Sequence, residues 1–388
     1  MTTALTRRGF LRRVTISTAA LAGATGGGLL STAARADTAR EAHEPPLYAF
    51  PFLGDLHYDK LEHHDLDWVQ QKMPKDLSQI HGYVRTTEQY TPRLLAEVRE
   101  QIKASAAPVP FAIQVGDLVE GLCGSFDLQS KQMNDATAAV DSASWGVPCL
   151  MVKGNHDITG PGAPQAFDQV LLPWMSKQAG QDLHTASYFR RQGDDLFVCF
   201  DAYKPDLDWL SATLGKNKAR LVFFVIHMPV VPYNARADWT IFHTKADAAR
   251  RERLLALLGK YRAIVLSGHL HKYSLLSRRT DAGPFVQLAV CSVLRHEHET
   301  PRQVLENINA YSPDLVKLEP EHAPATSDAR REMLKAEKPF IERYEYCDVP
   351  GYSMVKVYRD RVDVDVYVGL GEDNWRTRGL SPAPDAKA

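Results

Sequence analysis

Five short polar clusters, each at the end of an apolar run, constrain this sequence more than any other feature. The clearest is Gly154-Asn155-His156-Asp157, which follows the apolar run 148–152. A buried strand that ends in glycine here would place an amide, an imidazole and a carboxylate at its carboxyl end. Open α/β sheets hold their chemistry at that end. The sequence therefore predicts a functional site around residues 154–157.

The other four clusters repeat this pattern along the chain. Apolar runs that resemble core strands end in Gly54-Asp55-Leu56-His57, in Gly116-Asp117, at His227 and in Gly268-His269-Leu270-His271. Stretches with helical spacing, such as 91–104 and 129–145, lie between some of these runs. Alternating strands and helices predict βαβ units and a largely parallel sheet. Antiparallel strands are expected near the end, at 352–358 and 362–368.

Residues 1–36 are predicted to be a signal peptide rather than part of the fold. They contain five arginines, no acid, a twin-arginine pattern at Arg7-Arg8 and the small-residue ending Ala34-Arg35-Ala36. These features indicate recognition by the twin-arginine export machinery and a periplasmic or extracellular protein. The apolar stretch between them is short and interrupted by Gly, Ser and Thr, so no stable membrane anchor is expected.

The rest of the chain is expected to form one domain, residues 37–370, because it shows no internal repeat and no interdomain linker. Two polar stretches are interpreted as insertions: 58–90 beside the site and 295–343 at the periphery. Residues 371–388 lack periodicity, which predicts a flexible tail. Without residues 1–36 the formal charge is five units more negative than the −1 of the whole chain. A nucleic-acid partner is therefore not expected.

Taken together, the clusters resemble those of a known family. The order DxH, GDxx, GNHD, an isolated histidine and GHxH, from Asp55 to His271, is similar to that of the calcineurin-like metallophosphoesterases. This family includes purple acid phosphatases and cyclic-nucleotide phosphodiesterases. The resemblance implies a four-layer α/β/β/α sandwich of two mixed sheets flanked by helices. It also implies two metal ions per chain, Fe, Mn or Zn, which mixed histidine and carboxylate ligands do not distinguish.

The resemblance also implies a role for each matching residue. The ligands would be Asp55, His57 and His271 for the first metal, Asn155, His227 and His269 for the second, and Asp117 as the bridge. His156 would contact a phosphoryl oxygen or protonate the leaving group, with Asp157 orienting or charging it. A metal-bound hydroxide would attack phosphorus. No tyrosine stands where purple phosphatases have their charge-transfer ligand, so a coloured ferric centre is not expected.

The expected reaction is hydrolysis of a small phosphomonoester or phosphodiester. One alternative is a phosphodiesterase specific for cyclic nucleotides or glycerophosphodiesters, which would use the same centre. Another, of a different class, is a non-catalytic metal-binding or partner-binding protein on the same fold. Four side chains in nearby polar stretches are further candidates for substrate contact: His63, Tyr233, Arg236 and His243. No oligomeric state is predicted.

Overall fold

The computed structural model describes residues 44–322, 327–371 and 374–380. These residues belong to one compact unit, Glu44–Ala388. The predicted signal peptide lies outside the described residues, as do residues 372–373 and 381–388 of the predicted tail. Within the described ranges, no helix combines the length and the apolar character needed to cross a bilayer.

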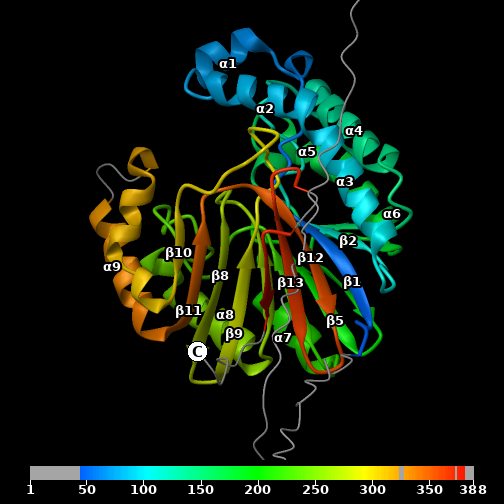
Figure 1. The fold of residues 1–388 in the computed structure, drawn as a ribbon. Helices are drawn as coiled ribbons and strands as arrows, with labels where there is room; N and C mark the ends of the chain where they lie inside the picture. Colours follow the sequence, from blue (N-terminus) through cyan, green and yellow to red (C-terminus); the bar gives the residue numbers. More distant parts are fainter. Residues whose placement is uncertain (1–43, 323–326, 372–373, 381–388) are drawn as a thin grey trace, which may run out of the picture. The chain divides into compact units, whose positions relative to one another are not determined.

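Two mixed sheets form the centre of this unit (Figure 1). The first sheet has the order β14-β13-β12-β1-β2-β3, in which β1, β2 and β3 are parallel. Its strands are β1 (Tyr48–Leu53), β2 (Ala112–Gln114), β3 (Cys149–Met151), β12 (Gly351–Val357), β13 (Val362–Val368) and β14 (Arg376–Gly379).

The second sheet has the order β10-β11-β8-β9-β7-β6-β5-β4, and its parallel strands are β5, β6, β7 and β9. Antiparallel strands continue it at both edges. Its strands are β4 (Tyr188–Gln192), β5 (Asp195–Phe200), β6 (Val222–Ile226), β7 (Ile264–Ser267), β8 (Tyr273–Thr280), β9 (Gly283–Ala289), β10 (Val304–Glu306) and β11 (Ile341–Cys347).

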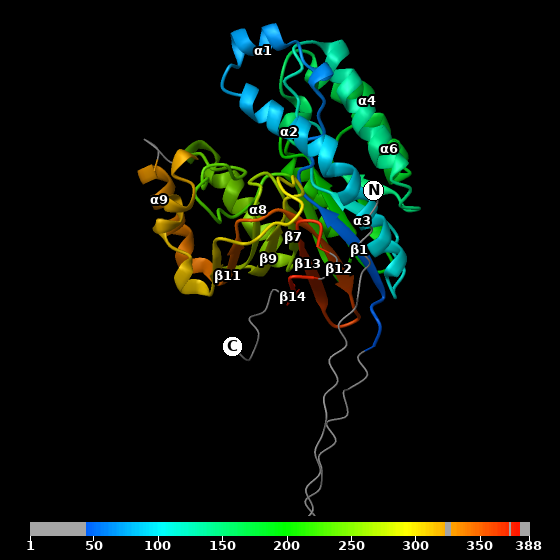
Figure 2. The ribbon, with the colours of Figure 1, turned by 45° about the horizontal axis from the view of Figure 1, so that its top comes forward.

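Helices lie against both sheets (Figure 2). Helices α3 and α6 contact the first sheet, and α8 contacts the second. The α-helices are α1 (Leu66–Lys72), α2 (Leu77–Gln89), α3 (Thr91–Ala104), α4 (Phe126–Ser142), α5 (Ala163–Ala166), α6 (Leu172–Ala179), α7 (Leu207–Lys216), α8 (Ala248–Lys260) and α9 (Ser327–Glu337). Short 3-10 segments lie at Leu61–His63, His156–Ile158, Lys245–Asp247, Ile308–Ala310, Pro313–Leu318, Pro320–His322 and Lys338–Phe340, and a π-helical turn at Phe167–Leu171.

The main core lies between the two sheets. Phe50 of β1 meets Phe197 of β5 edge to face at 5.5 Å, and Phe197 stacks on Phe223 of β6 at 4.5 Å between ring centroids. The next residue on β6, Phe224, points to the opposite face and joins a second core with α7 and α8. Strands buried on both faces read as unbroken apolar runs, as β6 does. The predicted four-layer arrangement of two mixed sheets between helices is confirmed.

Two segments differ from the prediction. Strand β11 begins inside the stretch 295–343 that was interpreted as a peripheral insertion, yet it pairs with β8 within the second sheet. Strand β14 lies in the predicted flexible tail, yet it pairs with β13. Both strands are rich in charge, which the sequence pattern assigns to solvent. Their charges instead pair with each other, since Arg378 Nε lies 2.8 Å from Glu345 Oε2.

Candidate metal centre

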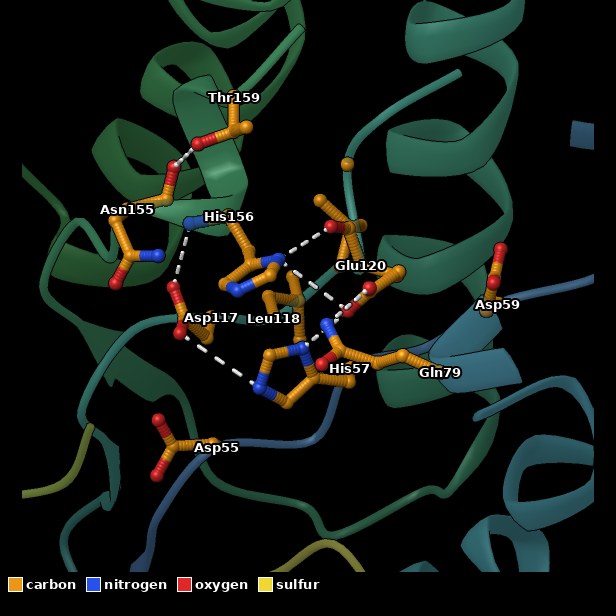
Figure 3. Close-up of polar contacts among 12 residues, drawn as sticks. Asp55, His57, Asp59, Gln79, Asp117, Leu118, Glu120, Asn155, His156 and Thr159 are labelled. Carbon is orange, nitrogen blue, oxygen red and sulfur yellow. Dashed lines mark hydrogen bonds and ion pairs between the residues drawn. The ribbon is translucent and has the colours of Figure 1, made fainter. Parts of the chain in front are cut away.

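The predicted ligands lie just beyond the carboxyl ends of parallel strands from both sheets. Figure 3 shows the residues that follow strands of the first sheet. Asp55 and His57 come after β1, Asp117 after β2, and Asn155 after β3. From the second sheet, His227 follows β6, while His269 and His271 follow β7. The structure thus brings together seven side chains that are separated by up to 216 positions in the sequence.

Four of these residues have a left-handed backbone conformation. The φ angles are 44° at His57, 51° at Asp117, 72° at His269 and 56° at His271. Residues other than glycine rarely adopt such angles, and each costs on the order of 1–3 kcal/mol. Strain of this kind persists where the surrounding structure imposes it, which is common at functional sites. Here it is concentrated on side chains that converge on one point.

Two glycines, Gly116 and Gly154, allow the loops at the ends of β2, β3 and β6 to approach one another closely. A Cβ atom on Gly154 would lie 2.1 Å from both the backbone nitrogen and Oδ1 of Asp117. Gly116 has a φ of 89°, and a Cβ atom there would lie 2.8 Å from Nδ1 of His227. Any side chain at these positions would displace the neighbouring predicted ligand.

Replacing Gly154 with alanine is expected to lower the free energy of unfolding by about 1–3 kcal/mol, the usual cost of overpacking a tight interior. Gly154→Ala should also lower the metal content, because Asp117 has to move. Urea unfolding and metal analysis measure the two effects. The control is Gly82→Ala in α2, where a new Cβ atom meets nothing within 4 Å and helix propensity favours alanine. Equal stability of both variants would contradict the prediction.

The first group of candidate ligands is Asp55, His57, Asp117 and His271, whose ligand atoms all lie within 4.8 Å of one another. Nε2 of His57 lies 2.9 Å from Nε2 of His271 and 3.6 Å from Oδ2 of Asp117. Nδ1 of His57 donates to Oε2 of Glu120 at 2.7 Å, so in a neutral ring Nε2 carries the lone pair. This lone pair faces a second imidazole and a carboxylate, so a cation could be bound between the three groups.

The second group is Asp117, His227 and His269. Nδ1 of His227 donates to the carbonyl oxygen of Val115 at 2.7 Å, which leaves Nε2 as the acceptor of a neutral ring. That Nε2 lies 3.2 Å from Oδ2 of Asp117 and 3.1 Å from Nδ1 of His269. Oδ1 of Asn155 is also 3.1 Å away. Nitrogen and oxygen acceptors at such short separations are the ligand set of a divalent metal site.

The two groups share Asp117 and have an open side. Asp55, His57, Asp117 and His227 are buried, whereas Asn155, His156, His269 and His271 remain partly exposed. The members of the two predicted ligand sets lie together, with Asn155 beside the second group, and their binding of metal stays a prediction. Burial disfavours the charge of Asp117, but the nearby rings of His227 and His156 hold the pKa of that carboxyl well below its usual range. The residues present therefore fit two metal ions joined by a carboxylate, with access from solvent.

Glu120 lies within the cluster and is a residue that the sequence prediction missed. It is fully buried, and its Oε2 lies 2.7 Å from Nδ1 of His57 and 3.3 Å from Nδ1 of His156. Gln79 donates to its other carboxylate oxygen at 2.8 Å. Figure 3 shows this carboxylate between the two imidazole rings. The only signal in the sequence is an acid three residues after Asp117, directly beyond an apolar pair.

The electrostatic surroundings of His156 favour its charged form. Burial alone would lower the pKa of this imidazole, but the charges of Glu120 and Asp117 outweigh burial and raise the pKa to about 9. Nδ1 donates to the backbone carbonyl of Glu120 at 2.6 Å. Nε2 has no hydrogen-bond partner among the described residues, so it is free to face a substrate.

Asp157 does not orient His156, and that part of the prediction is corrected. Its carboxylate accepts backbone N–H groups from Gly154 at 2.8 Å, Asp117 at 3.1 Å and Leu118 at 2.9 Å. Adjacent residues in the 3-10 turn His156–Ile158 point in different directions, so His156 reaches the open side while Asp157 points inward. Asp157 holds the Asp117 loop, and Glu120 has the position expected for Asp157.

The four additional candidates for substrate contact lie apart from the open side or are already paired. Tyr233 is fully buried, and its hydroxyl donates to the carbonyl of Lys272. Arg236 binds Glu319 through two nitrogens, at 3.1 and 3.2 Å. His63 is buried and bonds Asp135 at 3.0 Å. His243 is exposed, and its ring bonds the carbonyl of Thr240. These contacts engage the side chains within the protein. Arg236 still lies near the cluster, because its guanidinium stacks 5.0 Å from the ring of Trp239, which lies 5.7 Å from that of His269. Substrate contact by the four residues stays a prediction.

Aromatic side chains surround the cluster instead. Tyr83 of α2 stacks on the ring of His57, with centroids 4.4 Å apart. Tyr203 donates to Oδ1 of Asn155 at 3.4 Å. The ring of Trp239 lies 5.7 Å from that of His269. These contacts come from three separate segments, and none of them is visible as a sequence pattern.

Comparison with known proteins agrees with this geometry. A family model described as calcineurin-like phosphoesterase matches residues 50–273, more than half of the chain and all five clusters. The chain therefore belongs to the calcineurin-like phosphoesterase family. The clustered histidines and aspartates at the strand ends are compatible with a dinuclear metal site. No curated protein sequence matches the chain.

Among the solved structures with a similar fold are the following three proteins. PhoD has 12% identity and a TM-score of 0.49, with 88% of this chain and 73% of that chain covered. A purple acid phosphatase from yellow lupin (Lupinus luteus) seeds has 10% identity and a TM-score of 0.48, with 87% and 54% covered. GAP50, the anchor in the inner membrane complex of Plasmodium, has 12% identity and a TM-score of 0.48, with 87% and 90% covered. This chain thus spans about half of the lupin protein.

Proposed function

We propose that this protein hydrolyses small phosphoesters at a dinuclear metal centre. The observation that carries the proposal is the pair of ligand groups that share Asp117 and open to solvent beside the free Nε2 of His156. Asp55, His57 and His271 would hold the first ion, and Asn155, His227 and His269 the second. When bound, the metals would supply Lewis-acid charge and activate water. We propose Fe, Mn or Zn as the two ions.

The side chains of the protein would perform the other steps. The ligating residues would fix the two ions, and with them a phosphoryl group bound there, beside His156, which lowers the entropic cost of reaction. His156, charged through Glu120, would donate the proton on Nε2 to the oxygen of the departing alcohol. Glu120 also fixes the ring of His57 through Nδ1, so one carboxylate would position both a ligand and the acid. Asp157 would keep Asp117 in place.

A substrate panel with metal analysis tests the proposal. Protein loaded in turn with Fe, Mn and Zn is assayed with p-nitrophenyl phosphate and with bis-p-nitrophenyl phosphate. We expect hydrolysis of at least one of these esters, and the ratio of the rates separates a monoesterase from a diesterase. No hydrolysis of either ester, or of cyclic nucleotides and glycerophosphodiesters, by protein carrying two ions would favour a non-catalytic binding protein instead.

The proposal includes export through residues 1–36, which lie outside the described residues. Twin-arginine export carries folded proteins, so the metals would be acquired before translocation. The amino-terminal sequence of the protein recovered outside the cytoplasm would show cleavage after Ala36. Recovery of the full-length chain only inside the cytoplasm would contradict export.

Replacing Glu120 with glutamine is expected to change the pH dependence of hydrolysis. A histidine acid works below its pKa and fails as pH rises through it. Because the charge of Glu120 helps raise the pKa of His156 to about 9, its removal lowers that pKa. The basic limb of kcat should move down by about 1–3 pH units, the usual effect of one nearby charge.

The pH–rate profile is compared with that of Glu252→Gln, an exposed position on α8. Both proteins are checked for metal content, because Glu120 also contacts His57. An unchanged basic limb in Glu120→Gln with full metal content would mean that His156 is not the acid that limits the rate.

A further inference from the structure

A pocket of about 360 Å³ lies directly beside the first group of candidate ligands. His271 lines it, and Nε2 of His271 lies 2.9 Å from Nε2 of His57. His271 thus belongs both to the first ligand group and to the pocket lining, whereas His227 and His269 do not line the pocket. The pocket is at the lower end of the size range for small-molecule sites. It would accommodate one polar group and a short linker.

Three cationic side chains line this pocket: Lys272, Arg295 and Arg302. The guanidinium groups of Arg295 and Arg302 form no hydrogen bond or ion pair with any residue in the described ranges, and both side chains are exposed. Lys272 donates to the backbone carbonyl of Asp348 at 3.2 Å and lies 3.6 Å from Glu319. Guanidinium groups that have no carboxylate partner are suited to bind phosphate through two N–H groups.

The two carboxylates of the pocket are engaged by the backbone. Glu299 accepts the N–H groups of Arg295 and His296 at 3.0 and 3.1 Å. Asp348 accepts the N–H groups of Arg302 and Gln303 at 3.0 and 3.1 Å. Each acid therefore fixes the main chain at an arginine without pairing with its guanidinium group. Lysine and arginine charges outnumber acidic ones in the pocket lining.

The loop that carries these arginines is held in place from outside the pocket. The hydroxyl of Thr86 in α2 donates to the carbonyl of Leu294 at 2.8 Å. Arg93 in α3 pairs with Glu297 at 2.7 Å. Figure 1 shows this loop in yellow at the end of the sheets where α2 lies. A loop fixed at both helices presents its cations with a small entropic cost on binding.

From this placement we propose that the preferred substrate carries a second phosphate group, which binds Arg295, Arg302 and Lys272 while the scissile phosphate lies at the metal cluster. The inference rests on the proposed function, because it takes the metal cluster as the site of the scissile phosphate. A phosphate that is not cleaved would add binding energy and fix the orientation of the ester. The pocket would thus select bisphosphorylated small molecules over monophosphates.

Binding of non-hydrolysable ligands tests the pocket without relying on turnover. Propane-1,3-diyl bisphosphonate and propylphosphonate are titrated by calorimetry into the metal-loaded protein, and the butane and hexane pairs cover longer spacings. We expect at least one bisphosphonate to bind about tenfold or more tightly than its monophosphonate, the scale of a charge-assisted hydrogen bond. In the double variant Arg295→Gln/Arg302→Gln the affinity ratio should fall towards one.

The control is Arg359→Gln, which removes one arginine charge outside the pocket, at the turn between β12 and β13, where the side chain is 77% exposed. Its affinity ratio should equal that of the unmodified protein. Ligands in which a carboxylate replaces the second phosphonate distinguish the two anions. Preference for the carboxylate would overturn the assignment to phosphate. Equal affinity of bis- and monophosphonates would overturn the proposal that the pocket binds a second phosphate.

The same proteins are assayed for hydrolysis of propane-1,3-diol monophosphate and bisphosphate. Arginine-dependent binding of the bisphosphonate with no hydrolysis of any ester would refute the proposed function and support the pocket. Hydrolysis of both esters with equal kcat/KM, unaffected by Arg295→Gln/Arg302→Gln, would support the proposed function and refute the pocket.

Discussion

Asp117→Asn is expected to empty both metal positions and to abolish hydrolysis with them. Asp117 is the only side chain common to the two ligand groups, and its Oδ2 lies 3.6 Å from His57 and 3.2 Å from His227. An amide has no charge and one ligand oxygen, so it bridges two cations poorly. Mass spectrometry of the metals should show a fall from about two ions per chain to near zero.

The control is Asp182→Asn, the same change at a side chain that is 90% exposed. Circular dichroism establishes that both variants are folded, because Asp117 also accepts the backbone N–H of His156 at 2.8 Å. A folded Asp117→Asn protein that keeps one ion at full occupancy would mean that Asp117 serves a single position. The proposal of a shared bridge would then be wrong.

His156→Ala is expected to leave the metals in place and to lower kcat by about 10²- to 10⁴-fold, the usual contribution of a general acid. The ring of His156 contacts Glu120 through Nδ1 and lies beside the cluster, with its centroid 4.6 Å from that of His57. It belongs to neither of the two groups joined by Asp117, and the set that it forms with His57 and Glu120 is joined by contacts of both Nδ1 atoms with Glu120 Oε2. Turnover should therefore fall while metal content stays near that of the unmodified protein.

His184→Ala provides the control, since this side chain is 86% exposed. Leaving groups provide a second test. The loss in His156→Ala should be smaller for p-nitrophenyl phosphate than for an alkyl phosphate, because p-nitrophenolate departs without a proton. Loss of metal from His156→Ala would make His156 a ligand, and equal losses for both esters would contradict its role as an acid.

Much of the fold could be predicted because apolar runs and polar ends are local features. The helix expected at 91–104 is α3, with the same bounds. The apolar run that was expected to end at His227 contains β6 (Val222–Ile226), which is buried on both faces. Strands β11 and β14 were not predicted as parts of the two sheets, because their charges pair across the sheets and this pairing has no local pattern.

The candidate site was predictable only in part. The ends of parallel strands meet at one edge of a sheet, which was enough to predict that Asp55, Asp117 and Asn155 lie close together. His271 follows a strand of the second sheet, so its place beside them was implied only by the family resemblance. The acid that contacts the ring of His156 could not be predicted in this way. The acid next to it in the sequence is Asp157, but the acid that contacts the ring is Glu120. The direction of a side chain within a turn depends on which backbone groups need a partner.

By itself, the sequence determined the apolar runs and the order of the five polar clusters, because strand periodicity is a local pattern. The layers of the fold and the ligand set were implied by the resemblance of those clusters to a known family. Only the tertiary structure decided which carboxylate supports His156, which cations lack partners beside His271, and that Tyr233 and Arg236 are already engaged. These features join residues far apart in the chain. Their contacts depend on how the loops pack against one another, and spacing along the sequence does not carry that information.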